Sequence, residues 1–237
     1  MLVTGHRLLD VAKRHRFAVP AFNISDWAMC QGIFEISEQL LAPLIIAIHP
    51  DELDHLGIDL MPAVIRRAQR SSVPVAVHLD HGAGYEQIQV AIQAGFTSVM
   101  IDGSVLPFSE NVALTRQVTR AAHAVGTCHG IYPSWMTPEI RLDLLQQIAS
   151  KVTVPLVLHG GSANPDEEIA EAVALGTSKI NISSDIKVAY HATMRQVLQD
   201  LGVREPNVIQ PPCVRAMQAA AANKIRLFAA EGKAALF

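Results

Sequence analysis

The chain has 237 residues, of which 50% are hydrophobic and 17% are charged, with a formal net charge of −3. This length is sufficient to bury one large core, so we expect a single domain over residues 1–237. The sequence contains no basic block that could neutralise a nucleic-acid backbone. Its apolar runs are all much shorter than the roughly 18 residues of a membrane span. The first residues also lack the apolar core of a signal peptide. We therefore expect a cytoplasmic protein that binds neither nucleic acid nor membranes.

The three cysteines are far apart and show no C-x-x-C spacing, which indicates reduced thiols instead of disulfides or a thiolate metal site. Cys128 precedes His129, so a nucleophilic Cys–His pair is an alternative. Adjacent residues at the end of an extended strand point to opposite faces, which favours a packing thiol.

Four apolar runs have proline at the first strand residue, where the missing N–H costs little. They cover residues 19–23, 42–48, 73–78 and 154–159. The runs are continuous, which is typical of parallel strands that are buried on both faces. Amphipathic helical stretches separate them, at residues 28–41, 61–70, 85–94, 111–124, 137–150 and 166–175. The alternation predicts an α/β fold with a parallel sheet.

An internal repeat extends this pattern, because residues 73–101 recur in outline as residues 154–182. Both copies read as strand, polar loop, helix, glycine and second strand, the second strands being 98–103 and 179–184. Repeated βαβ units build either a barrel or an open doubly wound sheet. Chemically capable residues follow nearly every strand: Asn23, His49, Asp80, His81, Asp102, His129, His159 and Asn181. A barrel gathers strand ends around one site, so we expect a (β/α)8 TIM barrel.

Three histidines at separate strand ends, His81, His129 and His159, are each followed by glycine, which allows a ligand to approach closely. Three imidazoles can hold a catalytic zinc ion and leave one coordination position open. The alternative is a set of hydrogen-bonded core histidines, since no H-E-x-x-H motif fixes the geometry.

Two consecutive loops late in the chain, residues 159–164 and 181–185, carry small residues and hydroxyls. Such loops present free backbone N–H groups, and barrels favour the last two loops for phosphate. Each loop alone could equally be an ordinary turn or N-cap.

Asp80 ends an apolar strand next to His81, where a carboxylate could carry a proton to or from a substrate hydroxyl. Its alternative role is to orient a histidine. Lys179 enters its strand at the end remote from such a site, which argues against imine chemistry and favours metal activation.

Taken together, these segments resemble the class II fructose-bisphosphate and tagatose-bisphosphate aldolases. The motifs that carry the resemblance are His78-Leu79-Asp80-His81-Gly82, residues 98–104, Thr127-Cys128-His129-Gly130, residues 158–162 and residues 179–184. The resemblance implies zinc held by His81, His129 and His159, Asp80 as the catalytic residue, and a monovalent cation, Na⁺ or K⁺. It also implies that substrate and phosphate meet a set of loop residues: Asn23, Gly130, Gly160, Gly161, Ser162, Asn181, Ile182, Ser183 and Ser184.

The implied reaction is the reversible cleavage of a ketose 1,6-bisphosphate, of fructose or tagatose type, to dihydroxyacetone phosphate and an aldehyde phosphate. The implied assembly is a homodimer or homotetramer. The implied substrates and products are phosphorylated ketoses and dihydroxyacetone phosphate.

One departure from the family falls between Gly126 and Thr127. Relatives carry there a strand with a glutamate-rich loop, a helix and a further strand, and an eight-stranded barrel cannot close without them. Either residues are omitted here or the chain is a truncated relative. The alternative function is a catalytically impaired paralogue or assembly subunit that keeps the phosphate-binding barrel. A metal-free barrel lyase is a third hypothesis.

Overall fold

The computed structural model describes residues 1–121, 140–162 and 164–237. Within them, one parallel sheet has the strand order β4-β3-β2-β1-β6-β5. Its strands are β1 (Val19–Asn23), β2 (Leu44–Ile48), β3 (Val75–Gly82), β4 (Ser98–Ile101), β5 (Leu156–Leu158) and β6 (Thr177–Ile182). The α/β class, the four strands predicted from the apolar runs and the two second strands of the internal repeat are thereby confirmed.

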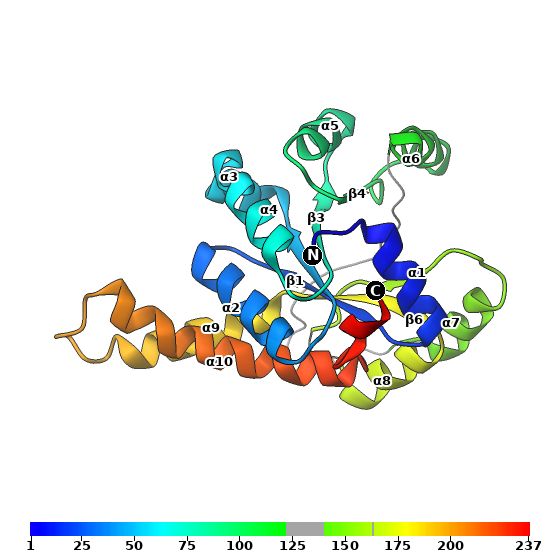
Figure 1. Ribbon diagram of the computed structural model, residues 1–237. Helices are drawn as coiled ribbons and strands as arrows, with labels where there is room; N and C mark the ends of the chain where they lie inside the picture. Colours follow the sequence, from blue (N-terminus) through cyan, green and yellow to red (C-terminus); the bar gives the residue numbers. More distant parts are fainter. Residues whose placement is uncertain (122–139, 163) are drawn as a thin grey trace.

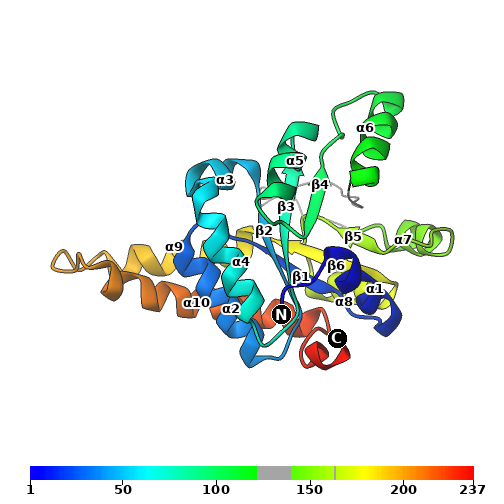
Figure 2. The ribbon, with the colours of Figure 1, turned by 45° about the horizontal axis from the view of Figure 1, so that its top comes forward.

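At least one helix lies between each pair of successive strands, and Figures 1 and 2 show the helices around the sheet. They are α1 (Gly5–His15), α2 (Trp27–Gln39), α3 (Pro50–Leu56), α4 (Met61–Arg70), α5 (Tyr85–Gln93), α6 (Phe108–Ala121), α7 (Leu142–Ala149), α8 (Asp166–Ala174), α9 (Ser184–Val197) and α10 (Pro206–Leu227). Short 3-10 turns occur at Ile58–Leu60 and Lys233–Leu236. Six of these helices match the amphipathic stretches within a few residues. No helix in the described ranges is long and apolar enough to cross a membrane.

The sheet is strongly curved. Asp80 on β3 and Asn181 on β6 are in hydrogen-bond contact although β2 and β1 lie between their strands. Contact across two intervening strands requires both side chains to point into the concave face. The carboxyl ends of the strands therefore surround a common space, as the barrel hypothesis requires.

The two outermost strands, β4 and β5, have no further strand on their outer edges among the described residues. The structure thus shows six parallel strands of a partial barrel, and the eight-stranded closure predicted from the sequence is not seen. Strand number, tilt and shear are linked, so the described part of the chain forms an open barrel wall between β4 and β5. The Gly126–Thr127 junction, where we located the departure from the family, lies outside the described residues.

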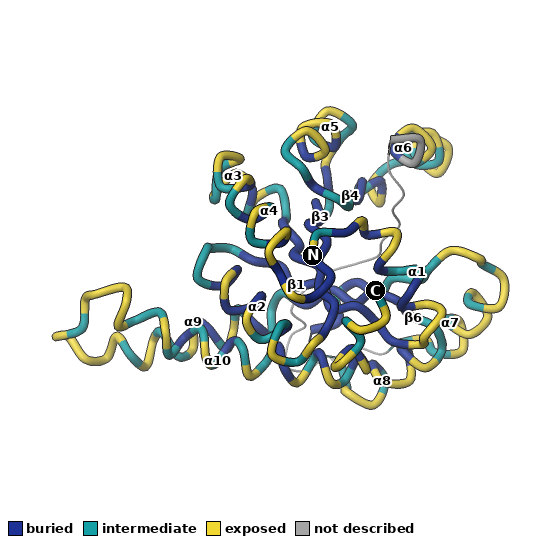
Figure 3. Tube along the Cα trace, in the orientation of Figure 1, coloured by how far each residue is buried: buried dark blue, intermediate teal, exposed yellow. Residues whose placement is uncertain are grey.

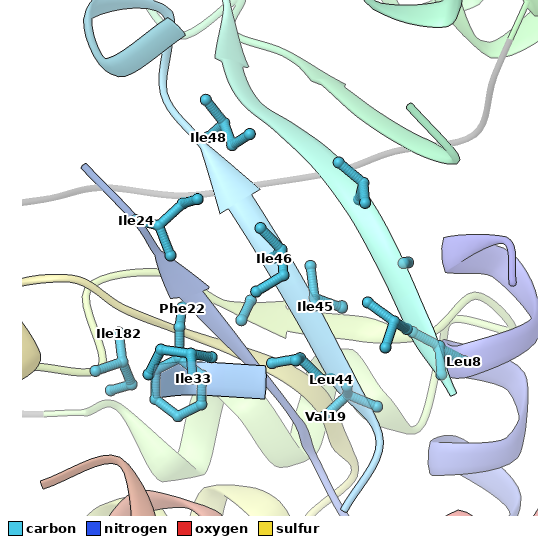
Figure 4. Close-up of a cluster of buried hydrophobic side chains, with 14 of the residues drawn as sticks. Leu8, Val19, Phe22, Ile24, Ile33, Leu44, Ile45, Ile46, Ile48 and Ile182 are labelled. Carbon is cyan, nitrogen blue, oxygen red and sulfur yellow. The ribbon is translucent and has the colours of Figure 1, made fainter. Parts of the chain in front are cut away.

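The hydrophobic core lies between the sheet and its covering helices. Figure 4 shows Phe22, Leu44 and Ile46 from the strands packed near Ile33 of α2 and Leu8 of α1. All five side chains are fully buried. Burying each such side chain contributes roughly 1.5–3 kcal/mol, which makes this side of the sheet a rigid support for the strand ends.

Burial falls away toward the two outermost strands. Val105 and Phe108, after β4, are 90% and 86% exposed, and Val154, before β5, is 53% exposed. Helix α7 has an amphipathic sequence but no buried residue. The far end of the α9–α10 hairpin also extends away from the sheet and is exposed (Figure 3).

Candidate active site at the strand ends

A bulge in β3 positions two neighbouring residues of the site. Leu79 pairs with Val99 and Gly82 with Ile101, so β3 has one residue more than β4 between these pairs. His81 lies within the bulge and has a left-handed φ of 54°. Bulges re-aim side chains near active sites, and a positive φ is uncommon outside glycine. In a regular strand Asp80 and His81 would point to opposite faces; here both reach the same space.

The ligand atoms of Asp80, His81 and His159 all lie within 4.8 Å of one another. His159 follows β5 and its side chain is fully buried. Its ring lies edge-on to that of His81, with 4.9 Å between the ring centroids. The structure therefore brings together three of the residues that the sequence proposed for metal binding and catalysis. His129, the third predicted zinc ligand, lies outside the described residues.

Asp102 holds the His81 ring. The Nδ1 atom of His81 is 2.7 Å from Oδ2 of Asp102, whose Oδ1 accepts the Ser104 amide N–H at 2.9 Å. The Ser104 hydrogen bonds, and then the one from His81, lower the pKa of Asp102 to about 2. A carboxylate accepts Nδ1–H, which selects the tautomer with the lone pair on Nε2, the arrangement usual for metal-binding histidines. The sequence placed Asp102 at a strand end but did not assign it this role.

Asp80 is completely buried and is held by two amides. Asn23 Nδ2 donates to Oδ2 at 2.8 Å, and Asn181 Nδ2 donates to Oδ2 at 3.2 Å. Burial by itself raises the pKa of Asp80, but Lys179, His78 and the other polar neighbours outweigh it and hold that pKa below its ordinary value. The carboxylate is therefore ionised at neutral pH.

The described donor set fits a metal ion. Two imidazoles and a carboxylate converge from β3 and the end of β5, and nitrogen-rich sites of this kind suit zinc. The carboxylate of Asp102 behind His81 supplies the supporting hydrogen bond that such sites use.

The loop after β5 is closely packed against β6. Gly160 has a φ of 67°, and a Cβ on Gly161 would lie 2.3 Å from Cγ2 of Ile180. Ser162 Oγ, Asn23 Oδ1 and Asn181 Oδ1 are buried and have no hydrogen-bond partner among the described residues. Buried polar atoms normally have partners, so these three are suited to meet the polar groups of a ligand.

The remaining predicted substrate residues lie in different kinds of positions: at the start of a helix, in the core, or outside the described residues. Ser183 is the N-cap of α9 and makes no side-chain capping bond, and Ser184 is the first residue of that helix. Ile182 is buried in the core, so only its backbone is available to a ligand. Gly130 lies outside the described residues.

Comparison with known proteins identifies the family. The profile described as "Fructose-bisphosphate aldolase class-II" matches residues 3–126 and 121–233. The fructose-bisphosphate aldolase of Geobacillus stearothermophilus is 32% identical, with 99% of each chain covered. A sulfofructosephosphate aldolase of Alkalicoccus urumqiensis is 31% identical, with 98% of each covered. The crystal structure of the YdjI aldolase from Escherichia coli superposes with a TM-score of 0.90 at 27% identity, over 99% of this chain and 100% of that one.

The same comparisons show that this chain is shorter than a relative to which it aligns. The profile matches in two pieces that meet at residues 121–126. The alignment with the Geobacillus enzyme extends over 286 residues, whereas this chain has 237, so at least 49 alignment positions have no residue here. The resemblance seen in the sequence is confirmed: the chain belongs to the class II fructose-bisphosphate aldolase family and is a carbon–carbon lyase of that class.

Proposed function

We propose that this protein is a zinc-dependent aldolase that reversibly cleaves a ketose 1,6-bisphosphate of fructose or tagatose type. The products are dihydroxyacetone phosphate and an aldehyde phosphate. The observation that carries the proposal is the convergence of Asp80, His81 and His159 within 4.8 Å at the carboxyl ends of the strands, in a chain of this family.

Asp80 is the proton-transfer residue of this proposal. In the cleavage direction its carboxylate accepts the proton of the C4 hydroxyl as the C3–C4 bond breaks, and the electron pair passes to the C2 carbonyl. Asn23 and Asn181 keep the carboxylate oriented, and burial excludes competing water. A zinc ion bound by His81, His159 and the predicted ligand His129 would polarise the ketone carbonyl.

Substrate phosphate and hydroxyl groups are assigned to Gly130, Gly160, Gly161 and Ser162 and to the segment from Asn181 to Ser184. Ser162 Oγ, which has no hydrogen-bond partner among the described residues, and the N-terminus of α9 support this assignment, because both can stabilise an anion. A monovalent cation, Na⁺ or K⁺, at these loops, a homodimeric or homotetrameric assembly, a cytoplasmic location and a single domain over residues 1–237 complete the proposal.

The metal assignment is tested by His81→Ala and His159→Ala, with His15→Ala on the exposed face of α1 as the control. Each site variant should lose both bound zinc, measured by elemental analysis, and cleavage, because a three-ligand site that loses one imidazole loses its geometry. Stoichiometric zinc with normal turnover in either variant would overturn the assignment. Full activity after exhaustive chelation would establish the metal-free alternative.

The substrate is tested with a panel of phosphorylated ketoses, since relatives of comparable identity carry different aldolase names. Fructose and tagatose bisphosphates differ at one hydroxyl, so small changes in hydroxyl contacts decide between them. NMR of each mixture should show dihydroxyacetone phosphate from one of these two. If dihydroxyacetone phosphate forms only from another ketose phosphate, the proposed substrate is wrong and the proposed type of reaction is still correct.

A second candidate is a catalytically impaired paralogue or assembly subunit. The partial barrel of the described residues favours it, because the Geobacillus relative aligns over at least 49 positions that have no residue here. This candidate predicts that the chain binds zinc and dihydroxyacetone phosphate but cleaves no member of the panel.

A further inference from the structure

A polar layer lies beneath the proposed site, where a parallel sheet normally carries Val, Ile or Leu. Side chains two residues apart on a strand share a face, so Lys179 accompanies Asn181 on β6 and His78 accompanies Asp80 on β3. Lys179 and His78 are only 4% and 3% exposed. Their layer lies toward the amino ends of the strands, one pleat below the carboxylate of Asp80.

The contacts in this layer select one arrangement of protons. Lys179 Nζ lies 3.2 Å from His78 Nε2, and His78 Nδ1 lies 2.7 Å from Ser98 Oγ. An ammonium group has no acceptor, so it must donate, and Nε2 of His78 must accept. The proton of the neutral imidazole is then on Nδ1 and is donated to Ser98.

The positive charge of Lys179 is unusual because it is buried inside the sheet. Lys179 is fully enclosed, and burial lowers its pKa to about 8 while the charge of Asp80 opposes that fall. Burial and the charge of Lys179 keep His78 neutral by lowering its pKa well below the ordinary value. An enclosed ammonium is costly unless a compensating negative charge is near, and Asp80 is the carboxylate in the next layer.

The proposed function gives Lys179 no chemical role, and its depth argues against imine formation. The Asp80–Asn181 layer lies between Lys179 and the space at the strand ends, so a substrate carbonyl reaches Asp80 first. Imine formation at Lys179 would require that layer to open.

We propose that Lys179 is the positioning residue for Asp80: its ammonium, oriented by the Nδ1–H tautomer of His78, supplies the buried positive charge that fixes the Asp80 carboxylate between Asn23 and Asn181. The role of Asp80 in turnover rests on the proposed function. The arrangement of Lys179, His78 and Ser98 does not, and it can be measured in protein that cleaves nothing.

The first test is the tautomer of His78, read from ¹⁵N-histidine NMR spectra of the wild-type protein and assigned by the signal missing in His78→Gln. We expect Nδ1–H in the wild type, and a shift toward Nε2–H in Lys179→Met, because Nε2 then lacks its donor and faces Oδ1 of Asp80 at 3.8 Å. Lys151→Met, at an exposed lysine, should leave the spectrum unchanged. An Nε2–H tautomer in the wild type would overturn the proposal, even if Lys179→Met did not fold.

The second test separates positioning from stability. Lys179→Met should retain zinc and keep KM within about twofold, while kcat falls on the order of 10- to 100-fold, the loss that a misplaced catalytic group causes. Ser98→Ala, which removes only the far end of the chain of hydrogen bonds, should cause a smaller loss in the same direction. Unchanged kcat in folded Lys179→Met refutes the positioning role. If the wild type has no turnover, the proposed function fails, and the tautomer still decides whether Lys179 orients His78.

Discussion

At the scale of single residues, the chemistry of the site depends on neighbours that fix charge and orientation. Asp80 is ionised because the buried cation of Lys179, the neighbouring histidines and the amide of Asn23 outweigh its burial, and His81 is oriented by Asp102. These contacts of Asp80 and His81 join residues that are distant in the sequence or are displaced by the bulge. The effect of each contact on activity can be measured by replacing one side chain at a time.

Asp80→Asn preserves the shape of the carboxylate but removes its charge and basicity. We predict that the variant retains zinc and affinity for dihydroxyacetone phosphate, while cleavage falls by a factor on the order of 10² to 10⁴, the usual contribution of a positioned acid or base. Elemental analysis, ligand titration and kcat measure the three quantities. Asp59→Asn, at an exposed residue, is the control. Loss of zinc together with activity would instead make Asp80 a structural residue.

Glu38 forms the best-organised ion pair outside the site. Arg67 donates to both carboxylate oxygens at 2.8 Å, and Ser71 Oγ donates at 2.8 Å. Arg67 also lies 4.5 Å from the ring centre of Phe34. The hydrogen bond from Arg67 is the main reason that the pKa of Glu38 is lowered, which outweighs partial burial.

A carboxyl with a lowered folded-state pKa stabilises the fold above its unfolded pKa, near 4.3 for Glu, and loses that contribution as pH falls through the folded value. Glu38→Gln should therefore lower the free energy of unfolding by about 1–2 kcal/mol at pH 7 and by less at pH 3.5, measured by urea denaturation. Glu231→Gln breaks an exposed pair with one contact to Arg226 and should change stability by less than about 0.5 kcal/mol. If the loss of unfolding free energy caused by Glu38→Gln is as large at pH 3.5 as at pH 7, this explanation is wrong.

At the scale of elements, the site depends on irregularities in otherwise regular strands. The bulge in β3 brings Asp80 and His81 to the same side, and the loop after β5 passes so close to β6 that only glycine fits. The amide of Gly161 donates to the carbonyl of Asn181 at 3.1 Å, which joins the two predicted phosphate loops.

Gly161→Ala should therefore disturb both loops. The added Cβ would meet Ile180 Cγ2 at 2.3 Å and the Asn181 carbonyl oxygen at 3.1 Å, so backbone or core must shift. We predict a loss of about 1–3 kcal/mol in unfolding free energy, the usual cost of overpacking, and a higher KM for the phosphorylated substrate. Gly84→Ala is the matched control because nothing lies within 4 Å of its Cβ. Equal effects of the two substitutions would show that packing at Gly161 is not tight.

At the scale of the whole molecule, the sheet ends in β4 and β5, which have no outer partner strand among the described residues, and exposed apolar side chains lie near both in the sequence. Val105 and Phe108 follow β4 in the chain, and Val154 precedes β5, as do Leu144 and Ile148 of α7. The alignment with the Geobacillus relative has at least 49 positions for which this chain has no residue. Each buried backbone group left without a hydrogen bond costs about 1–3 kcal/mol, which is large against a total stability of ~5–15 kcal/mol.

We predict that restoring the missing wall stabilises the protein. Insertion of the corresponding segment of the Geobacillus relative between Gly126 and Thr127 should raise Tm and lower the binding of a hydrophobic fluorescent dye, because the exposed flanks become covered. A flexible Gly/Ser insert of equal length is the control, and it should do neither. The proposal of an eight-stranded barrel fails if the two inserts behave alike.

The natural protein should itself carry the additional segment. We predict an intact mass about 5 kDa above the 25.7 kDa of this chain, from 49 residues at the chain's mean residue mass. Intact mass spectrometry of protein from its source measures this directly. A folded, soluble species of 25.7 kDa would show that the six-stranded form is complete, and it would favour the catalytically impaired paralogue.

The sequence by itself determined the α/β class, the six strands and the family. Continuous apolar runs with proline at their starts are local signals, and they fix strand type without reference to neighbours. The polar residues that follow the strands were also readable, because the ends of parallel strands meet at one edge.

Only the tertiary structure decided how these residues face one another. Strict alternation predicts opposite faces for Asp80 and His81, and it is the β3–β4 register shift that turns both to the site. Likewise, the sequence placed Lys179 far from the chemistry, whereas curvature of the sheet brings its ammonium across two strands to His78. Register and curvature result from packing of the whole sheet, and no local window of sequence specifies them.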